Sequence, residues 1–228
     1  MTALGAPMLI LVYWAIRGVA AGEPLTLLWS ATWNSVYVSI FAAMVSVSLA
    51  LPLAGLVVRH GGRLSALVER LTFVGFALPG IVVALALVFL GINVLINIYQ
   101  TLFLLVFGYV MLFLPAALNP LRTSLLQVSP RLEEVARSLG KRPLTVMATI
   151  TIPLLWPSLI AASALVFLLT MKELPVTLIL SPPGFTTLAT SIWSAASEAF
   201  FARAAVASLL LILATAFPLI WLLRKGDQ

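Results

Sequence analysis

Few side chains in this 228-residue sequence could carry out covalent or metal chemistry. It contains no cysteine and a single histidine, His60, which excludes thiolate nucleophiles, disulfides and clusters of zinc or haem ligands. A serine protease within a membrane would need a base beside its serine. His60 lies in a glycine-rich turn, at a different depth in the bilayer from the buried serines, so an intramembrane serine protease is the weaker alternative. The sequence has no GxxxxGK[ST] loop for ATP. We therefore expect no catalytic residue, no metal site and no cofactor in this chain.

Two charged residues, Lys172 and Glu173, lie inside a long apolar stretch, where a charge is unfavourable unless it has a partner or a function. A charge at the bilayer centre costs about 2.5 to 3.5 kcal/mol on insertion scales. Either Lys172 reaches the outer interface and Glu173 pairs with a cation, or Glu173 lies on a translocation path or at its outer gate. Pro79 and Gly80 should kink or open another helix, as a gating hinge or as a packing feature.

The elements that must position these residues are membrane helices. Hydrophobic residues make up 62% of the chain and charged residues 9%, against about 45 to 50% and about 25% in soluble domains. Lipid offers no hydrogen-bond partners, so spanning segments should be helical. We predict an all-α polytopic membrane protein, with one membrane domain over residues 1–228. Its five long spans are expected at residues 33–58, 71–95, 100–118, 154–180 and 203–223.

A sixth apolar stretch, residues 8–21, is short, so a signal peptide and a short span are both open. The first seven residues carry no positive charge, which favours a retained short helix. Apolar residues also recur at helical spacing between Pro183 and the last span, where a short helix at the outer surface is expected. Its apolar face would contain Leu188, Ile192, Ala196 and Ala199.

The basic residues indicate which way the chain faces. The formal net charge is +6, and ten of the 13 Lys and Arg residues fall in alternate connections or the C-terminal tail. Such connections face the cytoplasm, so the excess reflects orientation and not nucleic-acid binding. Both termini are therefore expected in the cytoplasm. The ten residues are Arg59, Arg63, Arg70, Arg122, Arg131, Arg137, Lys141, Arg142, Arg224 and Lys225.

The cytoplasmic loop over residues 119–153 is unusually long and patterned. Ser129 is a good N-cap, Pro130 suits the first helical position, and Gly140 can adopt the left-handed conformation that ends a helix. These signals predict a helix over residues 130–139, in which Glu133 can pair with Arg137. One face of it should be apolar, with Leu132, Val135, Ala136 and Leu139.

A second short amphipathic piece should begin at Pro143, with Leu144, Met147 and Ile150 on its apolar side; Pro153 and Pro157 should then break the chain. A helix as short as the one over residues 130–139 needs a surface against which to bury its apolar face. That surface is either the bilayer or neighbouring helix ends, or a cytoplasmic partner.

This loop resembles the EAA loop of ABC importer permeases, in which E-A-A, three residues, G and nine residues precede I-x-L-P. Every spacing matches, and two exchanges, at Val135 and Ile152, keep the apolar character. The resemblance is carried by the matched positions and by the apolar exchange at Val135: Glu134, Val135, Ala136, Gly140, Ile150 and Pro153.

The resemblance implies that the loop is a coupling helix seated in a cleft of an ATP-binding subunit, which binds ATP and magnesium and performs the hydrolysis. It implies that Glu134 meets a basic group of that partner and that Ala136 permits close approach. Gly140 would make the turn between the two short helices. Ile150 and Pro153 would fix the second helix against the membrane domain.

Three further segments, beginning at Ala77, Met171 and Phe185, are similar to the C-terminal half of iron(III) permeases. This similarity implies import of ferric iron across the inner membrane; thiamine, polyamines, sulfate and molybdate are the alternatives within the same scaffold. It also implies three kinds of partner: a second permease half, identical or homologous, two ATP-binding subunits, and a periplasmic or lipid-anchored solute-binding protein.

Overall fold

The computed structural model describes residues 2–20, 22 and 26–226, and every element in those ranges is a helix, as the sequence predicts. The elements are α1 (Thr2–Ala20), α2 (Thr26–Arg59), α3 (Arg63–Ala77), α4 (Gly80–Asn93), η1 (Ile96–Ile98), α5 (Leu102–Gln127), α6 (Pro130–Ser138), α7 (Pro143–Val146), η2 (Met147–Thr151), α8 (Ile152–Met171), α9 (Pro175–Leu180), α10 (Leu188–Ser197) and α11 (Phe201–Gly226).

Four of the described helical stretches are long and apolar enough to cross a membrane, and α3 with α4 makes a fifth if the pair counts as one broken span. The segment Gly5–Ala20 of α1 is a shorter apolar helix. The four long stretches are Leu28–Arg59, Leu102–Gln127, Pro143–Met171 and Phe201–Ile220. The sequence predicts five long spans and one short helix, and the number of long spans stays a prediction because it depends on how the pair α3 and α4 is counted.

Two predicted spans are not continuous helices. The span expected over residues 71–95 is interrupted at Leu78 and Pro79, between α3 and α4. Proline disfavours helical geometry in the residue before it, and Leu78 is accordingly extended, with φ −82° and ψ 137°. The span expected over residues 154–180 is interrupted at residues 172–174, because the ring of Pro175 suits the first position of a new helix, α9.

The break expected at Pro153 and Pro157 is wrong. Pro153 and Pro157 both lie within the helical stretch Pro143–Met171, which continues through them. The π-helical turn η2 directly precedes α8 and widens the helix next to Pro153. Within membrane helices, neighbouring groups commonly satisfy the backbone carbonyl that an internal proline frees.

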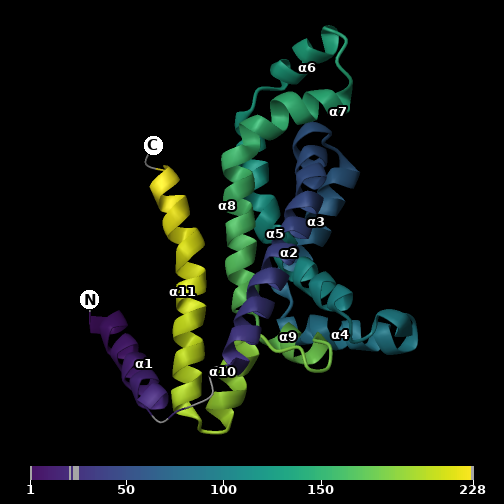
Figure 1. Cartoon of the computed structure of the whole chain (residues 1–228). Coiled ribbons are helices and arrows are strands. Elements are labelled where there is room, and N and C mark those ends of the chain that lie inside the picture. Colours follow the sequence, from purple (N-terminus) through teal and green to yellow (C-terminus); the bar gives the residue numbers. More distant parts are fainter. Residues whose placement is uncertain (1, 21, 23–25, 227–228) are drawn as a thin grey trace. The chain divides into compact units, whose positions relative to one another are not determined.

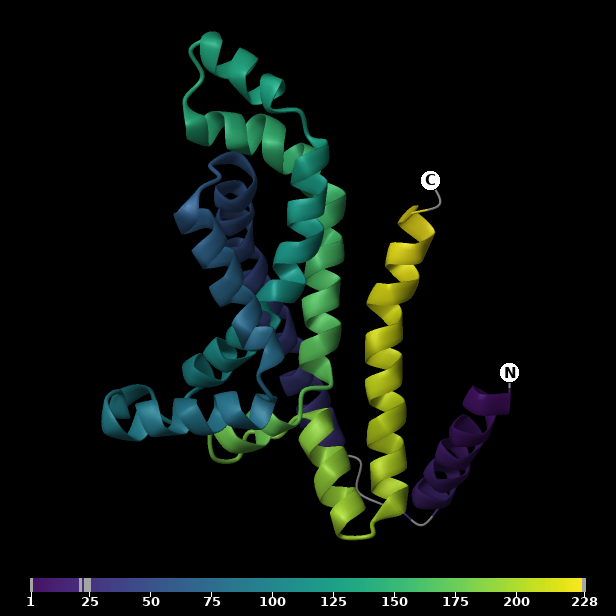
Figure 2. The same ribbon diagram turned by 180° about the vertical axis from the view of Figure 1, so that it is seen from behind.

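The chain divides into two compact units. Unit 1 comprises residues up to Phe41, Gly80–Gly108 and the residues from Leu168 onward. In it α11 packs against α1 and α10, and α4 packs against α9 (Figures 1 and 2). The α1 contact is close, since a Cβ added at Gly18 would lie 2.8 Å from the Cβ of Ala202. Small residues permit such an approach between membrane helices.

Unit 2 comprises Ala42–Pro79 and Tyr109–Phe167. Here α3 approaches α5 so closely that a Cβ at Gly75 would lie 2.5 Å from the carbonyl oxygen of Met111. An ion pair of 3.2 Å between Arg122 and Glu69 joins the same two helices. The helices α6 and α7 lie at the same end of this unit as the turn between α2 and α3 (Figures 1 and 2). The single membrane domain over residues 1–228 stays a prediction.

Candidate functional site

The helix predicted at residues 130–139 is confirmed as α6, and its end is built as expected. Gly140 has φ +82°, in the left-handed region. Its N–H donates to the carbonyl of Arg137 at 2.9 Å, and the N–H of Lys141 donates to the carbonyl of Ala136 at 3.2 Å. This pair of bonds is the Schellman arrangement that satisfies the last carbonyls of a helix. Gly140 therefore sets the direction in which the chain leaves α6 towards α7.

Most of the apolar face of α6 is open to the surroundings. Leu132, Val135 and Leu139 are 49%, 60% and 77% exposed, whereas Ala136 is 5% exposed. Ala136 thus lies on the side of α6 that faces the chain's own α7 and η2. The neighbouring Glu134 is exposed too. The helix presents a carboxylate and three aliphatic side chains outward, which are the groups that a protein partner could cover.

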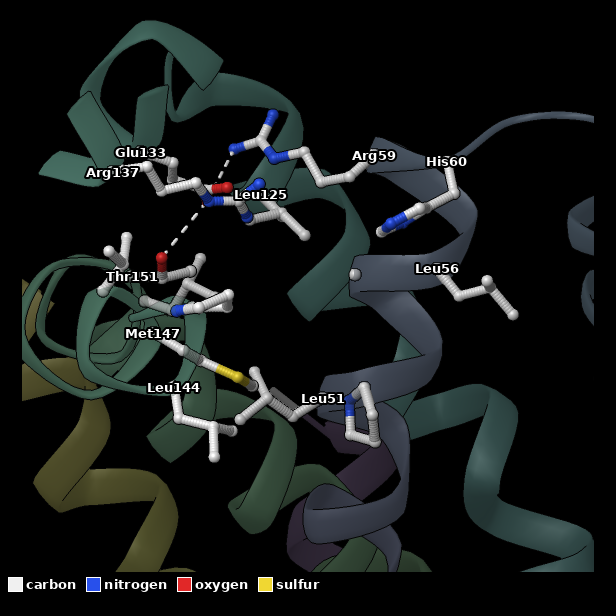
Figure 3. Close-up of a pocket in the computed structure, with 15 residues that line it drawn as sticks. Leu51, Leu56, Arg59, His60, Leu125, Glu133, Arg137, Leu144, Met147 and Thr151 are labelled. Atoms are coloured by element: carbon white, nitrogen blue, oxygen red, sulfur yellow. Dashed lines mark hydrogen bonds and ion pairs between the residues drawn. The ribbon is translucent and has the colours of Figure 1, made fainter. Parts of the chain in front are cut away.

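Glu133, unlike the exposed Glu134, contacts the chain's own helices. Its Oε1 accepts a hydrogen bond from the Thr151 hydroxyl at 3.2 Å and lies 3.4 Å from Nη2 of Arg59 (Figure 3). The side chains of Glu133 and Arg59 are only 13% and 15% exposed. The expected pairing of Glu133 with Arg137 is therefore wrong in the described part of the chain, since Arg59 at the end of α2 takes that place.

The second short helix begins at Pro143 as expected, but its inward side is different. Leu144 is 80% exposed, while Val146 and Thr151 are buried. The reason is local: α7 is a single turn and η2 has a π-helical pitch, so the spacing of a regular α-helix does not apply. Of the two residues expected to hold this segment in place, Ile150 is half-buried and Pro153 is exposed.

A cavity of about 350 Å³ lies beneath this loop within unit 2. Figure 3 shows the carboxylate of Glu133 between Arg59 and Thr151 at its edge. Its walls are largely aliphatic and come from α2, α5, α7, η2 and α8, with His60 and Arg137 also lining it. The apolar residues include Leu51, Leu56, Leu125, Leu144, Met147 and Leu155.

The proposed gate residues all stand at helix breaks. Pro79 ends the connection after α3, and Gly80 is the first residue of α4. Glu173 contacts the first turn of α9: its Oε1 accepts from the N–H of Val176 at 3.2 Å, and its carbonyl oxygen accepts from the Thr177 hydroxyl at 2.6 Å. Lys172 is exposed. The partner observed for the Glu173 carboxylate is thus a backbone N–H, and a role for these four residues in a gate stays a prediction.

The short helix expected before the last span is confirmed as α10, which starts with a capping box between Thr187 and Thr190. Its buried side contains Leu188, Ala189 and Ala195, whereas Ala196 and Ala199 are exposed, so the expected face was partly wrong. The cause is a contact distant in sequence: the N–H of Leu188 donates to the buried Ser35 hydroxyl at 2.7 Å, which sets the rotation of α10.

Sequence reasoning missed Arg59 and Thr151 as members of the loop site. Arg59 was read only as a marker of orientation, and 74 residues separate it from Glu133. Within the described ranges, no three His, Asp or Glu side chains gather as metal ligands would.

A family model matches most of the chain. The model described as "Binding-protein-dependent transport system inner membrane component" matches residues 44–224. The Fe(3+)-transport system permease protein FbpB 2 of Haemophilus influenzae is 40% identical over 225 residues, 97% of this chain and 44% of that protein. A putative 2-aminoethylphosphonate transport system permease protein, PhnV of Salmonella typhimurium, is 28% identical over 177 residues, 78% of this chain and 65% of that protein.

A solved structure, the MetNI methionine ABC transporter in an inward-facing conformation, is similar in fold. The TM-score is 0.72 at 16% sequence identity, over 89% of this chain and 96% of the solved chain. The fold is therefore MetI-like, which agrees with the resemblance of the loop over residues 119–153 to ABC importer permeases. The chain spans less than half the length of FbpB 2 and about two thirds of PhnV.

Proposed function

Because the chain belongs to the family of inner membrane components of binding-protein-dependent transport systems, we propose that it is one permease half of an ATP-driven importer. Its relatives are named permease proteins, and the chain itself carries no ATP-binding loop. Hydrolysis of ATP with magnesium therefore falls to a separate ATP-binding subunit. The chain contributes one side of the pathway and the surface through which ATP hydrolysis drives transport.

The observation that carries this proposal is the outward face of α6. A nine-residue helix is too short to be stable alone in water, yet Val135 and Leu139 are largely exposed. Glu134 beside them offers a charge for the edge of such a contact. A cytoplasmic subunit that covers these side chains and pairs with Glu134 would satisfy both features. A rigid turn at Gly140 then passes its movement to α7 and α8.

The orientation follows from the distribution of charge. Arg59, Arg63 and Arg70 flank the α2 to α3 turn, and α6 with its flanks carries Arg131, Arg137, Lys141 and Arg142. Positive residues concentrate on the cytoplasmic side of inner membrane proteins. The loop over residues 119–153 and both termini then lie in the cytoplasm, and α10 lies outside, where a solute-binding protein would dock.

A single chain of this kind supplies only one side of a pathway. We therefore propose a second permease half, identical or homologous, and two ATP-binding subunits, one for each coupling loop. Helix breaks are typical of membrane transporters near the pathway. The breaks at Pro79 and Gly80, and at Lys172 and Glu173, are the candidates for a gate, since each lets one part of a helix move without the other.

The proposed cargo is ferric iron, supported by the 40% identity with FbpB 2 over nearly the whole chain. The test is uptake in cells that lack the gene. Radiolabelled ferric iron uptake should fall at least about tenfold, because the pathway lacks one of its halves, and a plasmid copy should restore it. Uptake of 2-aminoethylphosphonate and spermidine should not change. Loss of one of those with normal iron uptake would reassign the cargo, and no loss of any uptake would contradict the transport proposal.

A further inference from the structure

The carboxylate of Glu133 joins three separate elements of unit 2. We propose that Glu133 is a positioning residue that carries the movement of α6 to α2 and α8, an inference that rests on the proposed importer function. Glu134, its neighbour, would dock the ATP-binding subunit, and Glu133 would connect the docked helix to the membrane helices behind it. Of these two adjacent carboxylates, Glu134 thus serves docking and Glu133 serves transmission of the movement.

The geometry gives Glu133 connections in two directions. Its Oε1 lies 3.4 Å from Nη2 of Arg59, the last residue of α2, and accepts from the Thr151 hydroxyl at 3.2 Å. Thr151 ends η2, one residue before α8 begins. Nη2 of Arg59 also donates to the carbonyl of Val128 at 2.9 Å, just before α6 starts. Arg59 therefore holds both the approach to α6 and its first turn.

Burial makes these connections stiff. With side-chain exposures of 13% and 15%, Glu133 and Arg59 are largely removed from water. Hydrogen bonds to ionised groups are stronger than neutral ones, and separating a buried charged pair leaves an uncompensated charge. Movement of α6 away from Arg59 or Thr151 is thus opposed more strongly than movement of a solvent-exposed pair would be.

Because a cavity lies beneath the loop, the polar contacts of Glu133 transmit more of the movement of α6 than apolar packing does. Well-packed side chains transmit displacement because interiors are dense and resist compression. Here a space of about 350 Å³ lies among Leu51, Leu56 and Met147, and Leu144 is 80% exposed. Apolar packing between α7 and the end of α2 is therefore incomplete. Around this cavity, the Arg59, Glu133 and Thr151 contacts bridge α2 to α6 and η2.

The test compares Glu133→Gln with the matched neighbour Glu134→Gln in the complete transporter, reconstituted with its ATP-binding subunits and binding protein. ATP hydrolysis and solute transport are measured in the same vesicles. Glu133→Gln should keep the ATP-binding subunit but move about tenfold less solute per ATP, the scale of a typical coupling free energy. Glu134→Gln should instead weaken retention of the subunit. Transport per ATP equal to wild type in Glu133→Gln would overturn the inference.

A second pair of substitutions separates transmission from folding. The chain has no cysteine, so Arg59→Cys with Glu133→Cys can be bridged specifically by a reducible bifunctional thiol reagent. Bridging should restore transport per ATP, and reduction should return it to the lower value of the unbridged variant. Normal coupling without the bridge, or no recovery once the bridge has formed, would overturn the role of Glu133. Failure of the wild-type complex to transport any solute with ATP would instead contradict the proposed function.

Discussion

Replacing Glu134 with lysine is expected to abolish transport and to release the ATP-binding subunit, while the chain still inserts into the membrane. Glu134 is exposed beside the apolar face of α6, and the proposed partner offers it a basic group. A lysine there replaces attraction with repulsion at the edge of the contact. Like charges brought together across an interface cost several kcal/mol, and about 3 kcal/mol corresponds to a weakening on the order of 100-fold.

The measurement is co-purification of the ATP-binding subunit together with uptake in the same cells. Ser197→Lys on α10 is the matched control, because Ser197 is also exposed on a short helix but lies on the side proposed to be outside. The control should retain the ATP-binding subunit. Full transport by Glu134→Lys would contradict the assignment of α6 as the docking helix.

Replacing Gly140 with proline should have the second large effect, the loss of coupling through a misdirected loop. The φ of Gly140 is +82°, whereas the proline ring holds φ near −65°. Proline also removes the N–H that donates to Arg137 at 2.9 Å. Both changes remove the turn from α6 to α7, so transport should fall to background.

Gly140→Asn is the control for this prediction, because asparagine tolerates left-handed backbone better than other residues with a Cβ, and no atom lies within 4 Å of a Cβ built at Gly140. The asparagine variant should retain most of the transport activity. Uptake at equal expression checks both variants. Equal uptake by the proline variant and the wild type would show that the turn does not matter for coupling.

Features set by local chemistry could be predicted from the sequence. The helix α6 begins at Pro130, which suits the first helical position, and ends before Gly140, and both signals lie within a few residues of the helix ends. The long apolar helices follow for a similar reason, since lipid leaves the backbone few alternatives. The EAA spacing of Glu134, Gly140 and Pro153 lies within one loop and is visible without knowledge of the fold.

Features that depend on distant contacts could not be predicted. Nothing near Glu133 indicates that Arg59, 74 residues earlier, displaces Arg137 as its partner. The inward side of α10 follows from a bond between Leu188 and Ser35, 153 residues apart. The apolar character of Leu132, Val135 and Leu139 does not predict whether they are exposed, because apolar residues occur both in interfaces with a partner and in the chain's own core.

The most direct test of the central claim, that α6 receives a cytoplasmic ATP-binding subunit, uses single cysteines in this cysteine-free chain. Val135→Cys, on the exposed face of α6, should cross-link to the ATP-binding subunit and resist a membrane-impermeant thiol reagent added to intact cells. Ser197→Cys on α10 should react with that reagent and form no such cross-link. Labelling of Val135→Cys from outside, with no cross-link to the ATP-binding subunit, would contradict the account.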